Sequence, residues 1–156
     1  CLAFSISEKS KRRINKNYIK KLKVKSSPIL AELKKGKDII YNGKKILAKN
    51  ATFIIPGKKI TYITDTLPND NCIKAAKNAD ILICEATFAD DLKNKAKEYQ
   101  HLTASDAAII AKKAKVKKLI LTHFSQRYKN TSTIEKEAKK IFKNTTTAKD
   151  FDIVNI

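Results

Sequence analysis

The chain has little of several residue types that mark common protein classes. Its 156 residues include no methionine or tryptophan, three glycines, three prolines and two histidines. No apolar run approaches the ~20 residues that a membrane-spanning helix requires. Because 42% of the residues are hydrophobic, a chain of this length can still bury a core. We therefore expect one compact, soluble domain without a membrane segment.

Cysteine is also scarce, and its spacing excludes two further classes. Cys1, Cys72 and Cys84 are odd in number and form no Cys-x-x-Cys pair, so neither a disulfide framework nor a cysteine zinc site is indicated. The apolar residues at positions 1–6 are too few for a signal peptide. The composition predicts an intracellular, cytoplasmic protein.

Acidic residues are too few to balance the basic ones. Fifteen Asp and Glu stand against 34 Lys and Arg, which gives a formal net charge of +19. Residues 8–50 alone hold fifteen Lys or Arg but only Glu8, Glu32 and Asp38, a net charge of +12. Such a concentration of positive charge attracts polyanions, and nucleic acid is the usual partner. The alternative explanation of this charge is that the organism's proteins are generally rich in lysine and that these lysines lie on solvated helix faces.

The basic segment carries patterns of local structure. Short helices are expected at residues 15–22 and 28–35, the second with Ser27 as N-cap, Pro28 as first helical position and Gly36 as stop. Asn42-Gly43 lies between two apolar stretches and predicts a β-hairpin.

From residue 59 onward, strand and helix patterns alternate. Strands are expected at residues 60–64, 80–85 and 118–122, and helices at 71–78 and 103–115. Thr103 and Asp106 resemble a capping box. A last helix begins near Ser132, and strands are expected at both ends, residues 1–7 and 151–156. This alternation predicts a layered α/β domain with a partly parallel sheet.

Polar residues follow three of these strands. Parallel strands bring their carboxyl ends to one edge of a sheet, so Asp65, Glu85 and His123 are expected to converge there. His101 precedes a helix N-terminus, and Arg127 lies just beyond His123. This set is typical of a metal-assisted phosphoryl or acyl hydrolase. Each residue alone also has a structural explanation, as a turn residue, a helix cap, a surface acid or a salt-bridge partner.

Four motifs in order carry a family resemblance: residues 62–66 (YITDT), 79–88 (ADILICEATF), 101–104 (HLTA) and 119–128 (LILTHFSQRY). Together they resemble ribonuclease Z of the metallo-β-lactamase superfamily. The resemblance implies an α/β fold, the C-terminal half of the αββα-type metallo-β-lactamase domain, with residues 1–156 a partial domain and residues 8–50 an inserted tRNA-binding arm. It also implies an enzyme that cuts precursor tRNA after the discriminator base, leaving a 3′ hydroxyl on the tRNA.

The resemblance assigns a role to each residue of the set. Asp65 is similar to the aspartate that bridges two zinc ions, and His123 to a ligand of the second zinc. Glu85 and His101 match the pair that transfers a proton to the leaving group. The expected phosphate-binding residues are Arg127, Ser125, Thr87 and Thr103. The expected tRNA contacts of the arm are Lys9, Lys11, Arg12, Arg13, Lys16, Lys20 and Lys21. Family members suggest a homodimer in which one subunit's arm serves the other's site.

The chain departs from the family pattern at several places. Cys84 stands where many members have histidine, Leu102 where serine is common, and Ser27-Pro28 where the arm has Gly-Pro. The family's His-x-His-x-Asp-His motif is missing, and two zinc ions need more ligands than Asp65 and His123 supply.

The chain also opens on Cys rather than Met and enters strand-like sequence at once. We therefore expect that an N-terminal half lies upstream or in another chain, and that the isolated chain is inactive. Two alternatives stay open: a catalytically inactive RNA-binding half, and another hydrolase of the superfamily acting on a small ester.

Overall fold

The computed structural model describes residues 3–156, which divide into two compact units. One unit consists of residues 3–7 together with Lys58–Ile156, and the other is Glu8–Gly57. Each unit has its own core of buried apolar side chains. No helix in the described part of the chain is both long and apolar enough to cross a membrane.

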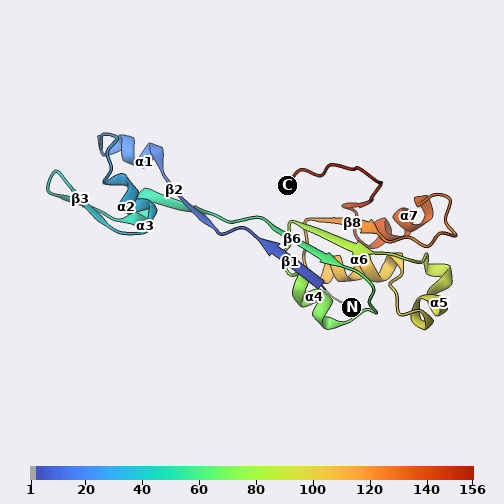
Figure 1. Cartoon of the computed structure of the whole chain (residues 1–156). Coiled ribbons are helices and arrows are strands. Elements are labelled where there is room, and N and C mark those ends of the chain that lie inside the picture. The colour runs from blue at the N-terminus through green and yellow to red at the C-terminus, as the bar shows by residue number, and fades with distance from the viewer. Residues whose placement is uncertain (1–2) are drawn as a thin grey trace. The chain divides into compact units, whose positions relative to one another are not determined.

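The first unit is built on a five-stranded sheet (Figure 1). Its strands, in spatial order, are β1 (Ala3–Ser7), β6 (Lys59–Ile63), β7 (Ile81–Glu85), β8 (Lys118–Thr122) and β9 (Thr145–Thr147). Strands β6 to β9 run parallel to one another, and β1 pairs antiparallel with β6. The three strands that carry candidate site residues, β6, β7 and β8, are therefore adjacent and share one carboxyl edge.

Three helices pack against this sheet: α4 (Asp70–Ala76) lies on β1 and β6, α6 (Ala104–Lys113) on β7 and β8, and α7 (Ser132–Ile141) on β9. Helix α6 also touches α4 and α7, so the three form one layer. Thr103 and Asp106 form the expected capping box at the start of α6. Two short elements, η1 (Asp90–Leu92) and α5 (Lys93–Glu98), precede α6.

On β1 and β6, the sheet face opposite the helices carries large apolar side chains that are exposed to solvent. Phe4 and Tyr62 are register partners on β1 and β6 and are 57% and 38% exposed. Ile6, further along β1, is 73% exposed. In a strand, neighbouring side chains point to opposite faces, so these residues lie opposite the buried Ile63 and Thr61. One face of the sheet is thus apolar near β1 and open to solvent among the described residues.

The second unit contains two short antiparallel ribbons and three helices (Figure 1). Strand β2 (Lys11–Ile14) pairs with β5 (Thr52–Ile55), and β3 (Ile39–Tyr41) pairs with β4 (Lys44–Ile46). The helices are α1 (Lys16–Lys21), α2 (Leu30–Lys34) and α3 (Ala48–Ala51). The hairpin expected at Asn42-Gly43 is confirmed, and both of these residues have positive φ, as its tight turn requires.

Two predictions of local structure are wrong. Residues 151–156 form no strand; the edge of the sheet is β9, further upstream. Helix α2 begins at Leu30 rather than at Pro28, and its N-cap is Ile29 rather than Ser27. Amide-to-carbonyl bonds from Leu30 to Ser27 and from Ala31 to Pro28 make a turn before the helix. Of the first expected strand, residues 1 and 2 lie outside the described residues.

Candidate functional site

The candidate site lies at the common carboxyl edge of β6, β7 and β8. Asp65 follows β6, Glu85 ends β7, and His123 follows β8 directly. His101 joins them from the loop between α5 and α6. Parallel pairing of the strands explains this convergence, because the three chain segments leave the sheet at the same level. The structure therefore brings together the four side chains that the sequence predicted.

Three of these residues can offer ligand atoms to one metal ion. Suitable atoms of Asp65, His101 and His123 lie within 4.8 Å of one another. Asp65 Oδ1 is 3.3 Å from His123 Nε2. Two ligands at zinc–oxygen and zinc–nitrogen bond lengths in a tetrahedral site lie about 3.4 Å apart. The spacing of Asp65 and His123 thus fits a shared zinc ion.

Glu85 is the buried centre of the site, with no solvent exposure. Its Oε1 accepts a hydrogen bond from the backbone N–H of Thr66 at 2.7 Å. Its Oε2 accepts from the backbone N–H of Leu102 at 3.2 Å and from the hydroxyl of Thr87 at 2.7 Å, and lies 3.0 Å from Nδ1 of His101. A buried carboxylate is tolerated when its oxygens are paired in this way.

His101 is oriented by Glu85. A carboxylate can only accept hydrogen bonds, so Nδ1 of His101 carries the proton in this 3.0 Å contact. The same Nδ1 is 3.9 Å from Asp65 Oδ1, which is outside hydrogen-bond range. With Nδ1 committed to Glu85, Nε2 is the nitrogen of His101 that is left for chemistry.

Two of the predicted phosphate-binding residues have hydroxyls that already bond inside the protein. Thr103 is buried, and its Oγ1 accepts from the backbone N–H of Asp106 in the capping box and donates to Asp106 Oδ2 at 2.9 Å. Thr87 Oγ1 contacts both Glu85 and His123. Phosphate binding by either threonine stays a prediction. In this structure both hydroxyls form hydrogen bonds to neighbouring protein side chains.

Arg127 and Ser125, by contrast, are held together near the open side of the site. Arg127 Nε donates a hydrogen bond to Ser125 Oγ at 3.0 Å. The guanidinium carbon lies 5.1 Å from the centre of the Phe88 ring, within cation–π range. Phe88 also lies 6.2 Å from the ring of His101, measured between centroids. These contacts hold the positive charge of Arg127 against Phe88, whose ring also neighbours His101.

Cys84 and Leu102, two residues that differ from the family pattern, are both buried. Cys84 faces the helix layer and is fully buried, and this burial raises the pKa of its thiol well above the usual value. Leu102 is also fully buried, but its backbone N–H bonds Glu85. A leucine side chain at this position therefore leaves the backbone contact with the acid intact.

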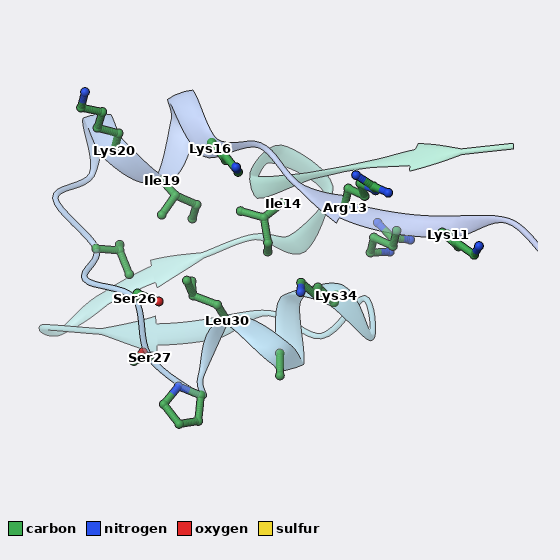
Figure 2. A pocket seen from close by; sticks show the side chains of 14 residues that line it. Lys11, Arg13, Ile14, Lys16, Ile19, Lys20, Ser26, Ser27, Leu30 and Lys34 are labelled. Carbon is green, nitrogen blue, oxygen red and sulfur yellow. The ribbon is translucent and has the colours of Figure 1, made fainter.

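The second unit, residues 8–57, carries a basic hollow of about 990 Å³ (Figure 2). Its lining combines positive and apolar side chains from β2, α1, α2 and the segments between them. The basic members are Lys11, Arg12, Arg13, Lys16, Lys20 and Lys34, and the apolar members include Ile14, Ile19, Val24 and Leu30. The five predicted arm residues among them, Lys11 to Lys20, thus share one surface of this unit.

Sequence reasoning missed the backbone donors of the site. The N–H groups of Thr66 and Leu102 hold Glu85, but no residue type at these positions reveals such a contact. It also missed the packing of Arg127 on Phe88. Only the loop geometry shows these partners.

Comparison with known proteins places this geometry in a family. A family model described as a beta-lactamase superfamily domain matches residues 20–124. The chain belongs to the β-lactamase superfamily. The expected fold class, an α/β fold of the metallo-β-lactamase type, is confirmed by this match and by solved structures of the same fold.

Similar members of the superfamily include ribonucleases Z. The chain is 37% identical over 149 residues to "Ribonuclease Z" of Protochlamydia amoebophila and 39% identical over 158 residues to that of Archaeoglobus fulgidus. Each alignment covers 96% of this chain but only 48% and 50% of the relative. The chain therefore spans about half the length of these curated relatives. The expected resemblance to ribonuclease Z is confirmed at the level of sequence.

Two solved structures of superfamily proteins resemble this chain. The short form of human tRNase Z matches with a TM-score of 0.52 and 31% identity, over 75% of this chain and 40% of that one. The metallo-beta-lactamase fold protein YhfI of Bacillus subtilis matches with a TM-score of 0.55 and 28% identity, over 72% of this chain and 45% of that one.

Proposed function

We propose that this chain is part of a zinc-dependent endoribonuclease that removes the 3′ trailer from precursor tRNA and leaves a 3′ hydroxyl on the tRNA. The cluster of Asp65, His123, His101 and Glu85, at the edge of a superfamily sheet, carries the proposal. Similarity to proteins named ribonuclease Z supports this substrate class. We propose that it works in the cytoplasm.

Asp65 and His123 would hold the metal. Carboxylate and imidazole are both ligands of zinc, and their 3.3 Å separation suits one ion. A bound metal would supply Lewis-acid polarisation of the scissile phosphodiester. Residues 3–156 offer at most three ligands in this cluster, and a site for two zinc ions needs more. We therefore propose that the remaining ligands come from an N-terminal half, upstream or in another chain.

The exposed apolar face of the sheet supports the proposal that an N-terminal half completes the domain. Phe4 and Ile6 together with Tyr62 present large apolar side chains to solvent on one sheet face. Contiguous exposed apolar surface of this kind marks an interaction site. The half of the relatives that this chain does not match is an appropriate occupant, since the alignments cover only about half their length.

His101 and Glu85 would deliver the proton to the leaving 3′ oxygen. Glu85 fixes the orientation of the His101 ring through the 3.0 Å contact with Nδ1, which leaves Nε2 free to face the substrate. Water would attack the phosphorus as the bond from phosphorus to the 3′ oxygen breaks, and a proton carried on Nε2 would be given to that oxygen. The oxygen becomes the tRNA 3′ hydroxyl, and the phosphate stays on the trailer. A hollow of about 470 Å³, lined in part by Lys93 and Lys97, lies beside His101 and offers space for RNA.

Arg127 and Ser125 would bind the phosphate oxygens around the cut. The Ser125 and Phe88 contacts restrict the guanidinium of Arg127, so less side-chain entropy is lost when a phosphate binds. Positive charge close to the scissile group also favours the developing negative charge of the transition state.

Residues 8–57 would grip the tRNA body. The net charge of +12 over residues 8–50 provides strong, salt-dependent attraction for a polyanion, and the basic hollow lies in the same unit. We propose a homodimer in which the arm of one subunit holds the RNA that the other subunit cuts.

The test is cleavage of a precursor tRNA by the full native protein, together with metal analysis. Wild type should contain zinc and release a tRNA with a 3′ hydroxyl. Asp65→Asn should lower kcat by at least about a hundredfold, because the amide replaces an anionic ligand. Asp150→Asn, an exposed acid outside the cluster, is the matched control. Full activity in Asp65→Asn would overturn the proposal, and salt-dependent tRNA binding without metal or cleavage would identify an inactive RNA-binding protein.

A further inference from the structure

The hydroxyl of Thr87 lies between the acid and the metal-ligand candidate of the site. Its Oγ1 is 2.7 Å from Glu85 Oε2, 2.9 Å from His123 Nδ1 and 3.0 Å from the carbonyl oxygen of His123. Thr87 is only 7% exposed. Its three contacts are therefore made in a largely water-excluded place, where unsatisfied polar atoms are costly.

The number of protons decides how these contacts are made. A hydroxyl has one hydrogen to donate and two lone pairs with which to accept. The Glu85 carboxylate and the His123 carbonyl can only accept, so the Thr87 hydrogen goes to these oxygens, chiefly to Glu85 at the shorter distance. The contact with His123 Nδ1 then needs its hydrogen from the ring.

The opposite arrangement is unfavourable. If Thr87 donated to Nδ1 of His123, its oxygen would face two acceptor oxygens at 2.7 and 3.0 Å with no hydrogen between them. Acceptor oxygens at these separations repel one another when no hydrogen lies between them, which disfavours this arrangement. The ring of His123 is therefore held with its hydrogen on Nδ1.

We infer that Thr87 is a positioning residue that fixes His123 as the Nδ1–H tautomer and so presents the Nε2 lone pair toward Asp65. Nε2 is the ring atom 3.3 Å from Asp65 Oδ1. A metal cation bound between these two electron-rich atoms would be coordinated by both. Only the consequence for metal binding rests on the proposed function. The tautomer itself follows from the hydrogen bonds.

The hydrogen bonds of Glu85 and Thr87 also link His101 to His123. Oε2 of Glu85 contacts both His101 Nδ1 and the Thr87 hydroxyl. A single carboxylate oxygen thus orients the proton-transfer candidate on one side and, through Thr87, the ligand candidate on the other. Hydrogen-bond partners of metal-binding histidines commonly act in this way.

The tautomer can be measured by ¹⁵N NMR of the histidine rings in the full native protein without metal, at a pH where His123 is neutral. The resonances of His123 are those that disappear in His123→Gln. Wild type and Thr87→Ser should show a protonated Nδ1 and an unprotonated Nε2, because serine retains the hydroxyl. Thr87→Val, of nearly the same shape, should shift His123 toward the Nε2–H form. A protonated Nε2 in the neutral ring of wild type would overturn the inference, whether or not Thr87→Val folds.

Zinc affinity gives a second readout that does not depend on cleavage. Loss of an outer hydrogen bond to a ligating histidine typically weakens metal binding about ten- to a hundredfold. Thr87→Val should show this loss by zinc titration, and Thr87→Ser should not. A wild-type protein with the Nδ1–H tautomer but no zinc affinity would refute the proposed metal function and leave the positioning role of Thr87 supported. Equal zinc affinity in Thr87→Val and wild type would refute the coupling of Thr87 to the metal.

Discussion

Replacing Glu85 by glutamine tests the hydrogen-bond network at the centre of the site. The change keeps the size of the side chain but turns one acceptor oxygen into an NH₂ donor. Backbone N–H groups approach both oxygens of Glu85, that of Thr66 at Oε1 and that of Leu102 at Oε2. Whichever way the new amide is turned, its NH₂ group faces a backbone donor.

The magnitude follows from burial. Glu85 has no solvent exposure, so water cannot replace the missing acceptor. One buried N–H left without an acceptor costs about 1–3 kcal/mol. For a protein of about 150–250 residues each kcal/mol lowers Tm by about 2–4 °C, and for a larger one by less, so Glu85→Gln should lower Tm by up to about 12 °C.

The assay is thermal unfolding of the full native protein followed by circular dichroism. Glu98→Gln is the control, because Glu98 is an exposed acid at the end of α5 and should change stability by less than about 0.5 kcal/mol. Cleavage by Glu85→Gln should also fall, since His101 loses its charged partner. A Tm equal to that of wild type would refute the view that both oxygens of Glu85 are committed acceptors.

Three further substitutions test other parts of the chain. Arg127→Lys should lower kcat about tenfold or more but leave Tm nearly unchanged, because an exposed lysine cannot reproduce the planar fork; an unchanged kcat would contradict its phosphate role. The double substitution of Lys16→Gln and Lys20→Gln should raise KM for the RNA. It should also reduce the slope of log affinity against log salt concentration by about 0.7–0.9 for each phosphate that is no longer neutralised. Lys149→Gln, the control, should change neither KM nor the slope. Burial raises the pKa of Cys84, so its thiol stays neutral in the folded protein while it ionises in the unfolded chain above its ordinary pKa of 9.0. Unfolding free energy should therefore fall with rising pH above that value by up to about 1.4 kcal/mol per pH unit more in wild type than in Cys84→Ala, and equal pH dependence would contradict this.

The sequence predicted the central strands and their edge well. β8 begins and ends where expected, because the run of apolar residues within 118–122 stops abruptly at polar ones. The convergence of Asp65, Glu85 and His123 followed from parallel pairing alone. Periodicity and strand direction are local properties, so a single sequence reveals them.

Other elements depend on distant partners and could not be predicted in the same way. Strand β2 consists largely of charged residues, Lys11 to Arg13, and forms because β5 pairs with it from 40 positions away in the chain. Residues 151–156 are rich in apolar and β-branched side chains, yet Phe151 is 99% exposed and the segment finds no strand partner in residues 3–156. Propensity indicates what a segment can form, and pairing decides whether it does.

Backbone conformation at the two ligand candidates shows why the site needs Glu85 and Thr87 together. Asp65 and His123 have φ of 51° and 57°, in the left-handed region that costs most residues about 1–3 kcal/mol. Each turn is held by one of the same two side chains. Glu85 binds the N–H of Thr66 just after Asp65, and the Thr87 hydroxyl lies 3.0 Å from the carbonyl of His123. Because Thr87 Oγ1 also donates to Glu85 Oε2 at 2.7 Å, the two side chains hold each other in place. Loss of either should therefore disturb both ligand candidates rather than one.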